Sequence, residues 1–151
     1  LNMSESIYNF FSAEEKKTIK SAIEDAERQT SGEIRVHIDN HCRGDVLDRA
    51  SNLFAQLKMH KTQLRNGILF YLAVKDRKFA ILGDAGINKE VPEGFWDEIR
   101  DEMKSNFKES KFTQGLESGI LKSGEQLKKY FPYKEGEDIN ELSDDISFGK
   151  E

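Results

Sequence analysis

Residues 67–74 read Gly67-Ile68-Leu69-Phe70-Tyr71-Leu72-Ala73-Val74, an apolar run without a single charge. A strand that is covered on both faces has this composition, whereas a half-exposed strand alternates apolar and polar residues. The run therefore predicts a central strand with helices on both sides.

Two further strands are predicted around this run. Residues 33–39 alternate Ile34, Val36 and Ile38 with polar side chains, which indicates a strand with one buried face. Residues 79–82 form a short apolar run after a polar turn. The order strand, helix, strand implies a right-handed crossover, so strands 33–39 and 67–74 are predicted to be parallel. The short turn makes strand 79–82 antiparallel to strand 67–74.

Four helices are predicted from apolar residues at helical spacing. The first opens at the capping box Ser12-Ala13-Glu14-Glu15 and ends near residue 31, and the others span about residues 45–60, 94–107 and 114–130. Trp96 belongs to the core stripe of the third, while Gly119 and Gly124 allow the fourth to pack closely. Residues 1–131 are thus expected to form one α/β domain with a mixed central sheet, followed by an acidic, flexible tail over residues 132–151.

Strand direction brings three polar patches to one edge of the sheet: Ser31-Gly32-Glu33, Arg65-Asn66-Gly67 and Gly83-Asp84-Ala85-Gly86. The two parallel strands begin at this edge, and the antiparallel strand ends there. Ligands of open α/β sheets usually sit at the opposite edge, beyond the carboxyl ends of the parallel strands. Such a group of oxygens suits a hard divalent cation. The predicted side-chain ligands are Glu33, Asn66 and Asp84, with Gly67 and Gly83 allowing close approach of the backbone.

Each of these residues also has an ordinary structural explanation. Asp84 could cap its own turn, Asn66 could adopt a left-handed backbone, and Glu33 could be an exposed strand end. Asp97 and Glu98 begin a helix soon afterwards and could complete the shell of a cation, although acids in a first turn are explained by the helix dipole. The prediction of a cation site therefore depends on the whole cluster.

The net charge of −5 lies entirely in the tail, where residues 134–151 contain seven acidic and two basic residues. A neutral body with an acidic tail argues against nucleic-acid binding, which needs a basic face. No apolar run approaches the roughly 20 residues of a membrane span. The single cysteine, Cys42, cannot form an internal disulfide, and no secretory signal is visible, so a cytoplasmic location is expected.

Other metal and phosphate motifs are excluded by their spacing. The glycine motif is too short for a phosphate loop and lacks its Lys-Ser/Thr ending. Asp144-Asp145 lacks the spaced acids and the central glycine of an EF-hand. His37, His41 and Cys42 could suggest zinc, but only the distant His60 remains as a fourth ligand. Polar residues at a strand end are the better explanation.

In these motifs the chain resembles the TPM domain family, named for plant thylakoid-lumen proteins and including bacterial and animal relatives. The similarity covers about Phe11 to Tyr130. It rests on the order and spacing of Thr30-Ser31-Gly32-Glu33-Ile34, Asn66-Gly67-Ile68-Leu69, Asp76-Arg77 and Gly83-Asp84-Ala85-Gly86. The glycine motif lacks the Tyr that is common in the family, and no membrane helix or glycine-rich tail follows. With residues 91–98, these departures resemble a soluble bacterial branch.

The resemblance implies a Rossmann-like sheet covered by helices on both faces. It also implies a divalent cation, often calcium, at the loop cluster, which favours calcium over magnesium for this chain. For the plant members it implies a reported acid phosphatase activity.

Three functions remain open. The favoured one is a binding or interaction module, in which the ion orders the loops and an unidentified protein partner contacts them, for example through the Trp96 helix. The alternative is an enzyme, a metal-assisted acid phosphatase. Against it, no arginine pair, phosphate cradle or nucleophile is evident, and Arg65 is the one cation near the patches. The third is a scaffold domain that binds no ion.

Overall fold

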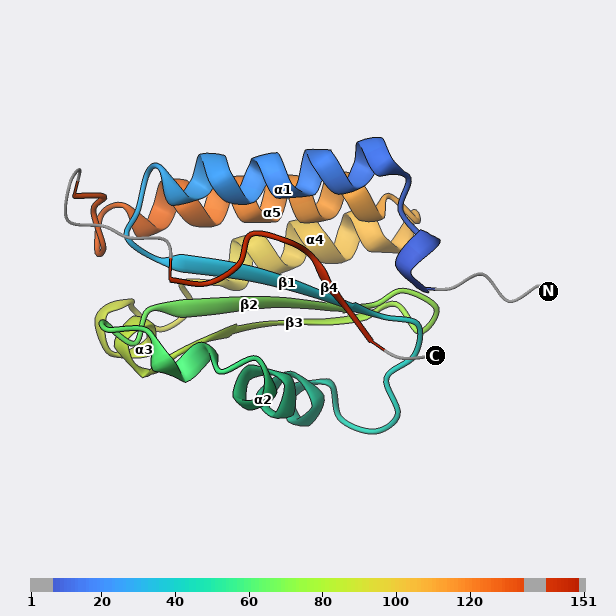
Figure 1. The fold of residues 1–151 in the computed structure, drawn as a ribbon, viewed down its shortest axis with the longest axis horizontal. Coiled ribbons are helices and arrows are strands. Elements are labelled where there is room, and N and C mark those ends of the chain that lie inside the picture. Colours follow the sequence, from blue (N-terminus) through green and yellow to red (C-terminus); the bar gives the residue numbers. More distant parts are fainter. Residues whose placement is uncertain (1–6, 135–140, 150–151) are drawn as a thin grey trace.

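The central sheet has the strand order β3-β2-β1-β4 in the computed structural model, which describes residues 7–134 and 141–149 (Figure 1). β1 (Glu33–Asp39) and β2 (Gly67–Ala73) are parallel, and β3 (Lys78–Gly83) runs antiparallel to β2. The predicted α/β fold with a mixed sheet is therefore confirmed.

β2 is buried along its whole length, as its composition predicts. Successive side chains of a strand point to opposite faces. Phe70 accordingly lies in a large core on one face, while Leu69 and Tyr71 lie in a smaller core on the other. Since Phe70 is fully buried, its truncation to alanine is expected to cost about 3–5 kcal/mol.

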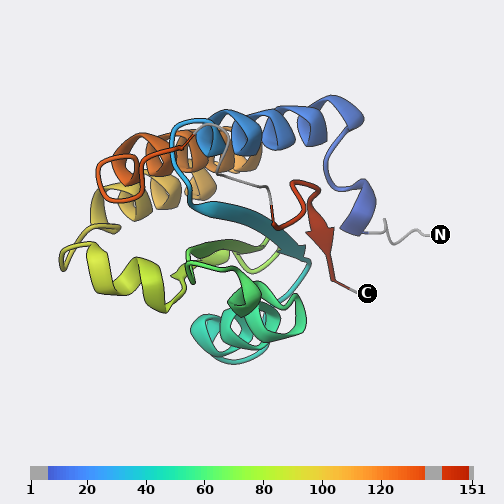
Figure 2. The same ribbon diagram turned by 60° about the vertical axis from the view of Figure 1, so that its left-hand side comes forward.

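The large core is covered by α1 (Ala13–Glu27), α4 (Asp97–Lys108) and α5 (Phe112–Leu127), which lie on the same face of the sheet in Figures 1 and 2. The capping box between Ser12 and Glu15 starts α1 as predicted. The helices touch through glycines of α5, since a Cβ on Gly119 would lie 2.6 Å from the sulfur of Met103. This close approach also agrees with the sequence.

The other face carries α2 (Val46–Gln56) and the 3-10 turn η2 (Met59–Lys61), whereas α3 (Ala85–Glu90) follows β3 and contributes Ile87 to the large core. α2 ends before residue 60 because Lys58 has a left-handed backbone, with a φ of 56°, and a right-handed helix cannot continue through such a residue. α3 was not predicted, and it begins directly after Asp84. The smaller core fills the space between α2 and the sheet.

The remaining helix boundaries differ by a few residues from those predicted. α4 begins at Asp97 rather than at residue 94, because Gly94 has a φ of 80° and turns the chain just before the helix. α5 begins at Phe112 and ends at Leu127, and the 3-10 turn η1 (Ile7–Asn9) precedes α1. In the described ranges, no helix has the length and apolarity needed to cross a membrane.

Part of the expected tail belongs to the sheet. Residues 141–149, here called the C-terminal segment, contain β4 (Ser147–Phe148), which pairs in parallel with β1. Phe148 also packs against the large core. The sequence predicted three strands, and β4 was missed because two residues carry no periodicity. Residues 135–140 of the expected tail lie outside the described residues.

Candidate functional site

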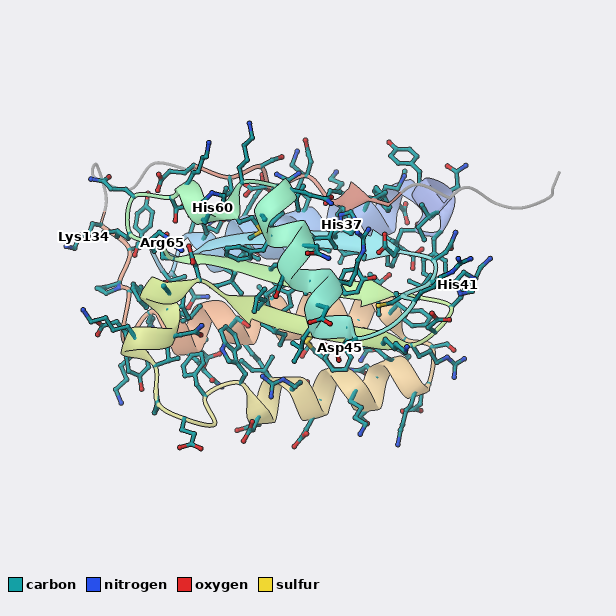
Figure 3. All side chains as sticks on the ribbon, turned by 90° about the horizontal axis from the view of Figure 1, so that it is seen from below. His37, His41, Asp45, His60, Arg65 and Lys134 are labelled. Atoms are coloured by element: carbon teal, nitrogen blue, oxygen red, sulfur yellow. The ribbon has the colours of Figure 1, made fainter. Side chains whose placement is uncertain are left out.

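The three polar patches meet at one edge of the sheet, as strand direction predicts. Glu33 and Gly67 are paired in the register of β1 and β2, and the Glu33 amide donates to the carbonyl of Asn66 at 3.0 Å. The Asp84 amide donates to the carbonyl of Gly67 at 2.9 Å. Arg65 marks this edge in Figure 3, while His41 marks the opposite one. We call it the N-edge, because β1 and β2 begin there.

Glu33 is buried rather than exposed, with 6% of its surface accessible. Its Oε1 accepts hydrogen bonds from the backbone amides of Glu141 at 2.7 Å and Leu142 at 3.0 Å. Burial raises the pKa of Glu33 to about 7, against the opposing effect of these two amides. The carboxyl group therefore attaches the start of the C-terminal segment to the N-edge.

Asn66 is the most buried of the predicted ligands, at 2% accessible. Its Nδ2 donates to the carbonyl of Ser31 at 2.7 Å, which links the starts of β1 and β2. Its Oδ1 is buried and accepts no hydrogen bond from any described residue. Such an acceptor is costly in a folded protein unless a further donor or ion reaches it.

Asp84 is the N-cap of α3 and forms a bidentate ion pair with Arg65. Its Oδ2 accepts from Arg65 Nε and its Oδ1 from Arg65 Nη2, each at 2.7 Å, while Oδ1 also accepts from the Ala85 amide. Burial alone would raise the pKa of Asp84, but the hydrogen bonds from Arg65 and Ala85 lower it below its usual value. Asp84 is thus ionised, and its charge is balanced by Arg65.

The glycines of the N-edge are packed closely against the protein's own atoms. A Cβ on Gly67 would lie 3.1 Å from the carbonyl oxygen of Met59, and one on Gly83 would lie 3.0 Å from a methyl group of Ile87. The tightest is Gly86, where a Cβ would lie 2.2 Å from the carbonyl oxygen of Leu64. The glycine motif therefore holds α3 against the loop that carries Arg65.

Asp97 and Glu98 are exposed in the first turn of α4. Asp97 forms an ion pair with Arg100 at 3.4 Å. In the described part of the chain, no hydrogen bond or ion pair joins either acid to Glu33, Asn66 or Asp84, so their position agrees with stabilisation of a helix N-terminus.

A second pair of acids lies beside Glu33. Glu27 accepts a hydrogen bond from the Ile34 amide at 2.9 Å, and its pKa is raised to about 10 by burial first and by the nearby Asp144 next. Asp144 Oδ1 is buried and receives no donor from the rest of the described chain. The raised pKa means that the Glu27 carboxyl group keeps its proton near pH 7.

The opposite edge holds a polar cluster that the sequence did not reveal. Asp39 accepts from Arg49 Nε at 3.0 Å and from the Tyr71 hydroxyl at 2.6 Å. The Nε2 of His37 lies 3.1 Å from Asp39 Oδ1, and its Nδ1 lies 2.7 Å from Ser147 Oγ. Burial would raise the pKa of Asp39, but these hydrogen bonds hold it far below the usual range. The cluster fixes β4 to the end of β1.

His37 and Asp39 were expected on the polar face of a half-exposed strand. That face is covered by α2, which supplies Arg49, so both side chains are buried at 4% and 6%. The spacing of His37 and Asp39 two residues apart was the available signal, since such residues share a face. The partner of Asp39, Arg49, lies ten residues away in a separate helix, so no local pattern revealed the cluster.

His37, His41 and Cys42, which could suggest zinc, each form a hydrogen bond with an aspartate in the structure. His41 Nδ1 lies 2.9 Å from Asp76 in the hairpin, while His37 binds Asp39, so the two histidines have separate partners. Cys42 is buried, and its amide donates to Asp76. Over residues 7–134 and 141–149, no three His, Cys, Asp or Glu side chains are grouped so as to hold a metal ion.

Fold and site together define an α/β sandwich whose loops gather at the N-edge of a mixed sheet. The chain belongs to the TPM domain family, whose model matches residues 7–126. The expected family resemblance is therefore confirmed. None of the curated proteins matches the chain.

Solved structures show the same fold. The BA42 protein of the psychrophilic bacterium Bizionia argentinensis is 51% identical, with a TM-score of 0.89, over 97% of this chain and 100% of that one. The N-terminal domain of a P. gingivalis protein is 20% identical, with a TM-score of 0.66, over 82% and 80%. The N-terminal domain of cg2496 from Corynebacterium glutamicum is 13% identical, with a TM-score of 0.63, over 97% and 91%. The last two are similar in fold.

Proposed function

We propose that the chain is a divalent-cation-binding module whose ion sits at the N-edge. Asp84 and Asn66 are the principal side-chain ligands, Glu33 supplies a further carboxylate, and backbone carbonyls and water complete the shell. Gly67 and Gly83 keep the backbone close to the ion.

The buried Oδ1 of Asn66 carries this proposal. Asn66 directly precedes β2, the strand that lies between β1, which begins at Glu33, and β3, which ends just before Asp84. An amide oxygen without a donor is a suitable ligand for a hard cation, which would satisfy its lone pairs. A carboxylate that is ionised, as that of Asp84 is, supplies the charge such an ion needs.

Calcium is the favoured ion. It accepts six to eight oxygen ligands in flexible geometry, whereas magnesium demands a near-ideal octahedron. The N-edge is built from three loops, with carboxylate, amide and carbonyl oxygens of unequal reach, so the less demanding ion fits it better. Asp97 and Glu98 remain proposed as outer ligands at most, since both are exposed in α4.

Isothermal titration with calcium and with magnesium tests the proposal. The wild type is expected to bind calcium more tightly, and Asp84→Asn is expected to lose most of this affinity while retaining its cap on α3. Asp45→Asn is the matched control, because Asp45 is also the N-cap of a helix, α2. Equal binding by the wild type and Asp84→Asn would refute the role of Asp84, and absence of binding by the wild type would favour a scaffold without an ion.

As an interaction module, the chain would present the ordered N-edge loops to an unidentified protein partner. Trp96 itself cannot be the contact, since it is only 8% accessible and belongs to the large core. A partner would therefore meet the loops or the exposed face of α4.

The metal-assisted acid phosphatase remains the alternative, carried over from the family. At the N-edge, Arg65 is paired with Asp84. Release of phosphate from a phosphomonoester by the purified protein, lost in Asp84→Asn, would support the enzyme.

A further inference from the structure

The ion pair between Asp84 and Arg65 is asymmetric. The side chain of Asp84 is 5% accessible, whereas that of Arg65 is 51% accessible. The carboxylate accepts a hydrogen bond from the Ala85 amide, while the guanidinium approaches it from the solvent side. Arg65 is thus the partner that can leave without opening the core.

The guanidinium and a cation would compete for the same oxygens. Arg65 binds both Oδ1 and Oδ2 of Asp84, and Ala85 takes a further lone pair of Oδ1. A divalent ion at these oxygens would lie within about 4 Å of the guanidinium, where two positive charges repel strongly. Both cannot occupy the carboxylate together.

The backbone of Arg65 stays fixed when its side chain moves. Its amide donates to the carbonyl of Thr62 at 3.2 Å, and its own carbonyl accepts from the Gly86 amide at 2.9 Å. Its φ of 52° is left-handed, so the chain makes a sharp turn at this residue. Rotation about side-chain bonds is sufficient to remove the guanidinium from Asp84.

Building on the proposed cation site, we propose that Arg65 is the resident counter-charge of Asp84 and that a divalent cation displaces it. Without the ion, Arg65 neutralises the buried carboxylate. With the ion, the guanidinium turns to solvent, and the site exchanges one positive charge for two. Arg65 consequently limits the affinity of the site, because every binding event first breaks a bidentate pair.

Arg65→Met tests this exchange, since methionine keeps an unbranched side chain but has no charge. Calcium affinity measured by titration calorimetry is expected to rise about tenfold, which corresponds to loss of one moderate competing interaction. Lysine keeps the positive charge but cannot form a bidentate pair with a carboxylate. The calcium affinity of Arg65→Lys is therefore expected to lie between those of the wild type and Arg65→Met.

Arg77→Met is the matched control. Arg77 also has a φ of 52° and an exposed side chain, but its guanidinium donates to the backbone carbonyl of Lys108 and to the Ser110 hydroxyl rather than to Asp84. The Arg77→Met substitution removes the same charge from the chain as Arg65→Met does, so an effect of net charge alone would appear in both variants. Calcium affinity of Arg77→Met is expected to equal that of the wild type.

The Arg65 Nε–H resonance in nuclear magnetic resonance spectra provides a second measurement. It is expected to exchange slowly with water while bound to Asp84 and rapidly after calcium is added. If the wild type binds calcium but folded Arg65→Met binds no tighter, or if the Nε–H stays protected at saturation, Arg65 is not displaced, although the cation site stands. If neither protein binds calcium, the cation site and the displacement fail together.

Discussion

The carboxyl group of Glu33, at the start of β1, accepts a hydrogen bond from the backbone amide of Leu142 at 3.0 Å, although the two residues are 109 positions apart. Ser147 and Phe148 of the same segment pair with the end of β1. The C-terminal segment therefore lies along the free edge of β1 and is fixed at both ends. Glu33 is consequently shared between the attachment of this segment and the proposed cation site.

Glu33→Ala is expected to loosen the C-terminal segment, because two amides lose their acceptor and must bind water instead. The loss of stability should be about 1–3 kcal/mol, the usual cost of removing one partner from a buried hydrogen bond. Faster hydrogen exchange of the Gly149 amide, which donates to the Ile38 carbonyl at 2.9 Å, is the measurement. Glu125→Ala, an exposed acid of α5, is the control, and unchanged exchange in Glu33→Ala would contradict the attachment.

Gly149→Ala is expected to undock β4. A Cβ at this position would lie 1.8 Å from Oδ1 of Asp39, so either the segment or the carboxylate must move. Asp39 is held by Arg49, Tyr71 and His37, and the segment is the weaker partner. Loss of amide protection at Phe148 and Gly149, with the protection of β2 retained, would report this. Full protection at both amides would contradict undocking and would show that the Asp39 side chain moves instead.

Asp39→Asn is expected to destabilise the fold by about 2 kcal/mol in denaturant unfolding at pH 7, because Arg49 keeps its charge and loses its partner. The pH dependence has a definite sign. Since the pKa of Asp39 is lowered in the fold, its contribution is complete above its unfolded value of 3.8 and is lost as the pH falls further. Asp39→Asn should therefore show a smaller loss of stability in acid than the wild type. An equally steep acid loss would contradict the pKa shift.

Glu27→Gln is expected to flatten the stability profile at high pH. Burial raises the pKa of Glu27 from its ordinary value of 4.5 to about 10, so between these values the folded state keeps a proton that the unfolded state has released. Stability therefore falls as the pH rises through this window, and Glu33 adds a smaller fall between 4.5 and about 7. Denaturant unfolding at pH 5, 7 and 9 should show a smaller decline for Glu27→Gln, and parallel profiles would exclude Glu27 as the cause.

Strand direction could be inferred from the sequence because a predicted helix links the first two strands, a short turn links the second to the third, and the apolar run at 67–74 is unambiguous. That inference correctly placed Glu33, Asn66 and Asp84 at one edge. It could not place their side chains. The pairing of Asp84 with Arg65 depends on a left-handed turn at a residue that rarely adopts one, and no pattern announces it.

The polar cluster at the other edge was missed for a related reason. Whether a polar strand face is exposed depends on what covers it, and the covering helix α2 comes from a separate part of the chain. β4 escaped prediction because its two residues are held by His37 and the edge of β1, while Glu33 holds the start of the same segment at Glu141, and such contacts between distant residues leave no local pattern.

The central claim is that a divalent cation binds at the N-edge, and a calcium titration followed by nitrogen–proton correlation spectra tests it most directly. We predict saturable shifts of the Asn66 side-chain amide and of the Gly67 and Asp84 backbone amides, with the amides of Asp39 and Asp76 at the opposite edge unchanged. Saturable shifts confined to the opposite edge, or none at the N-edge at millimolar calcium, would contradict the claim.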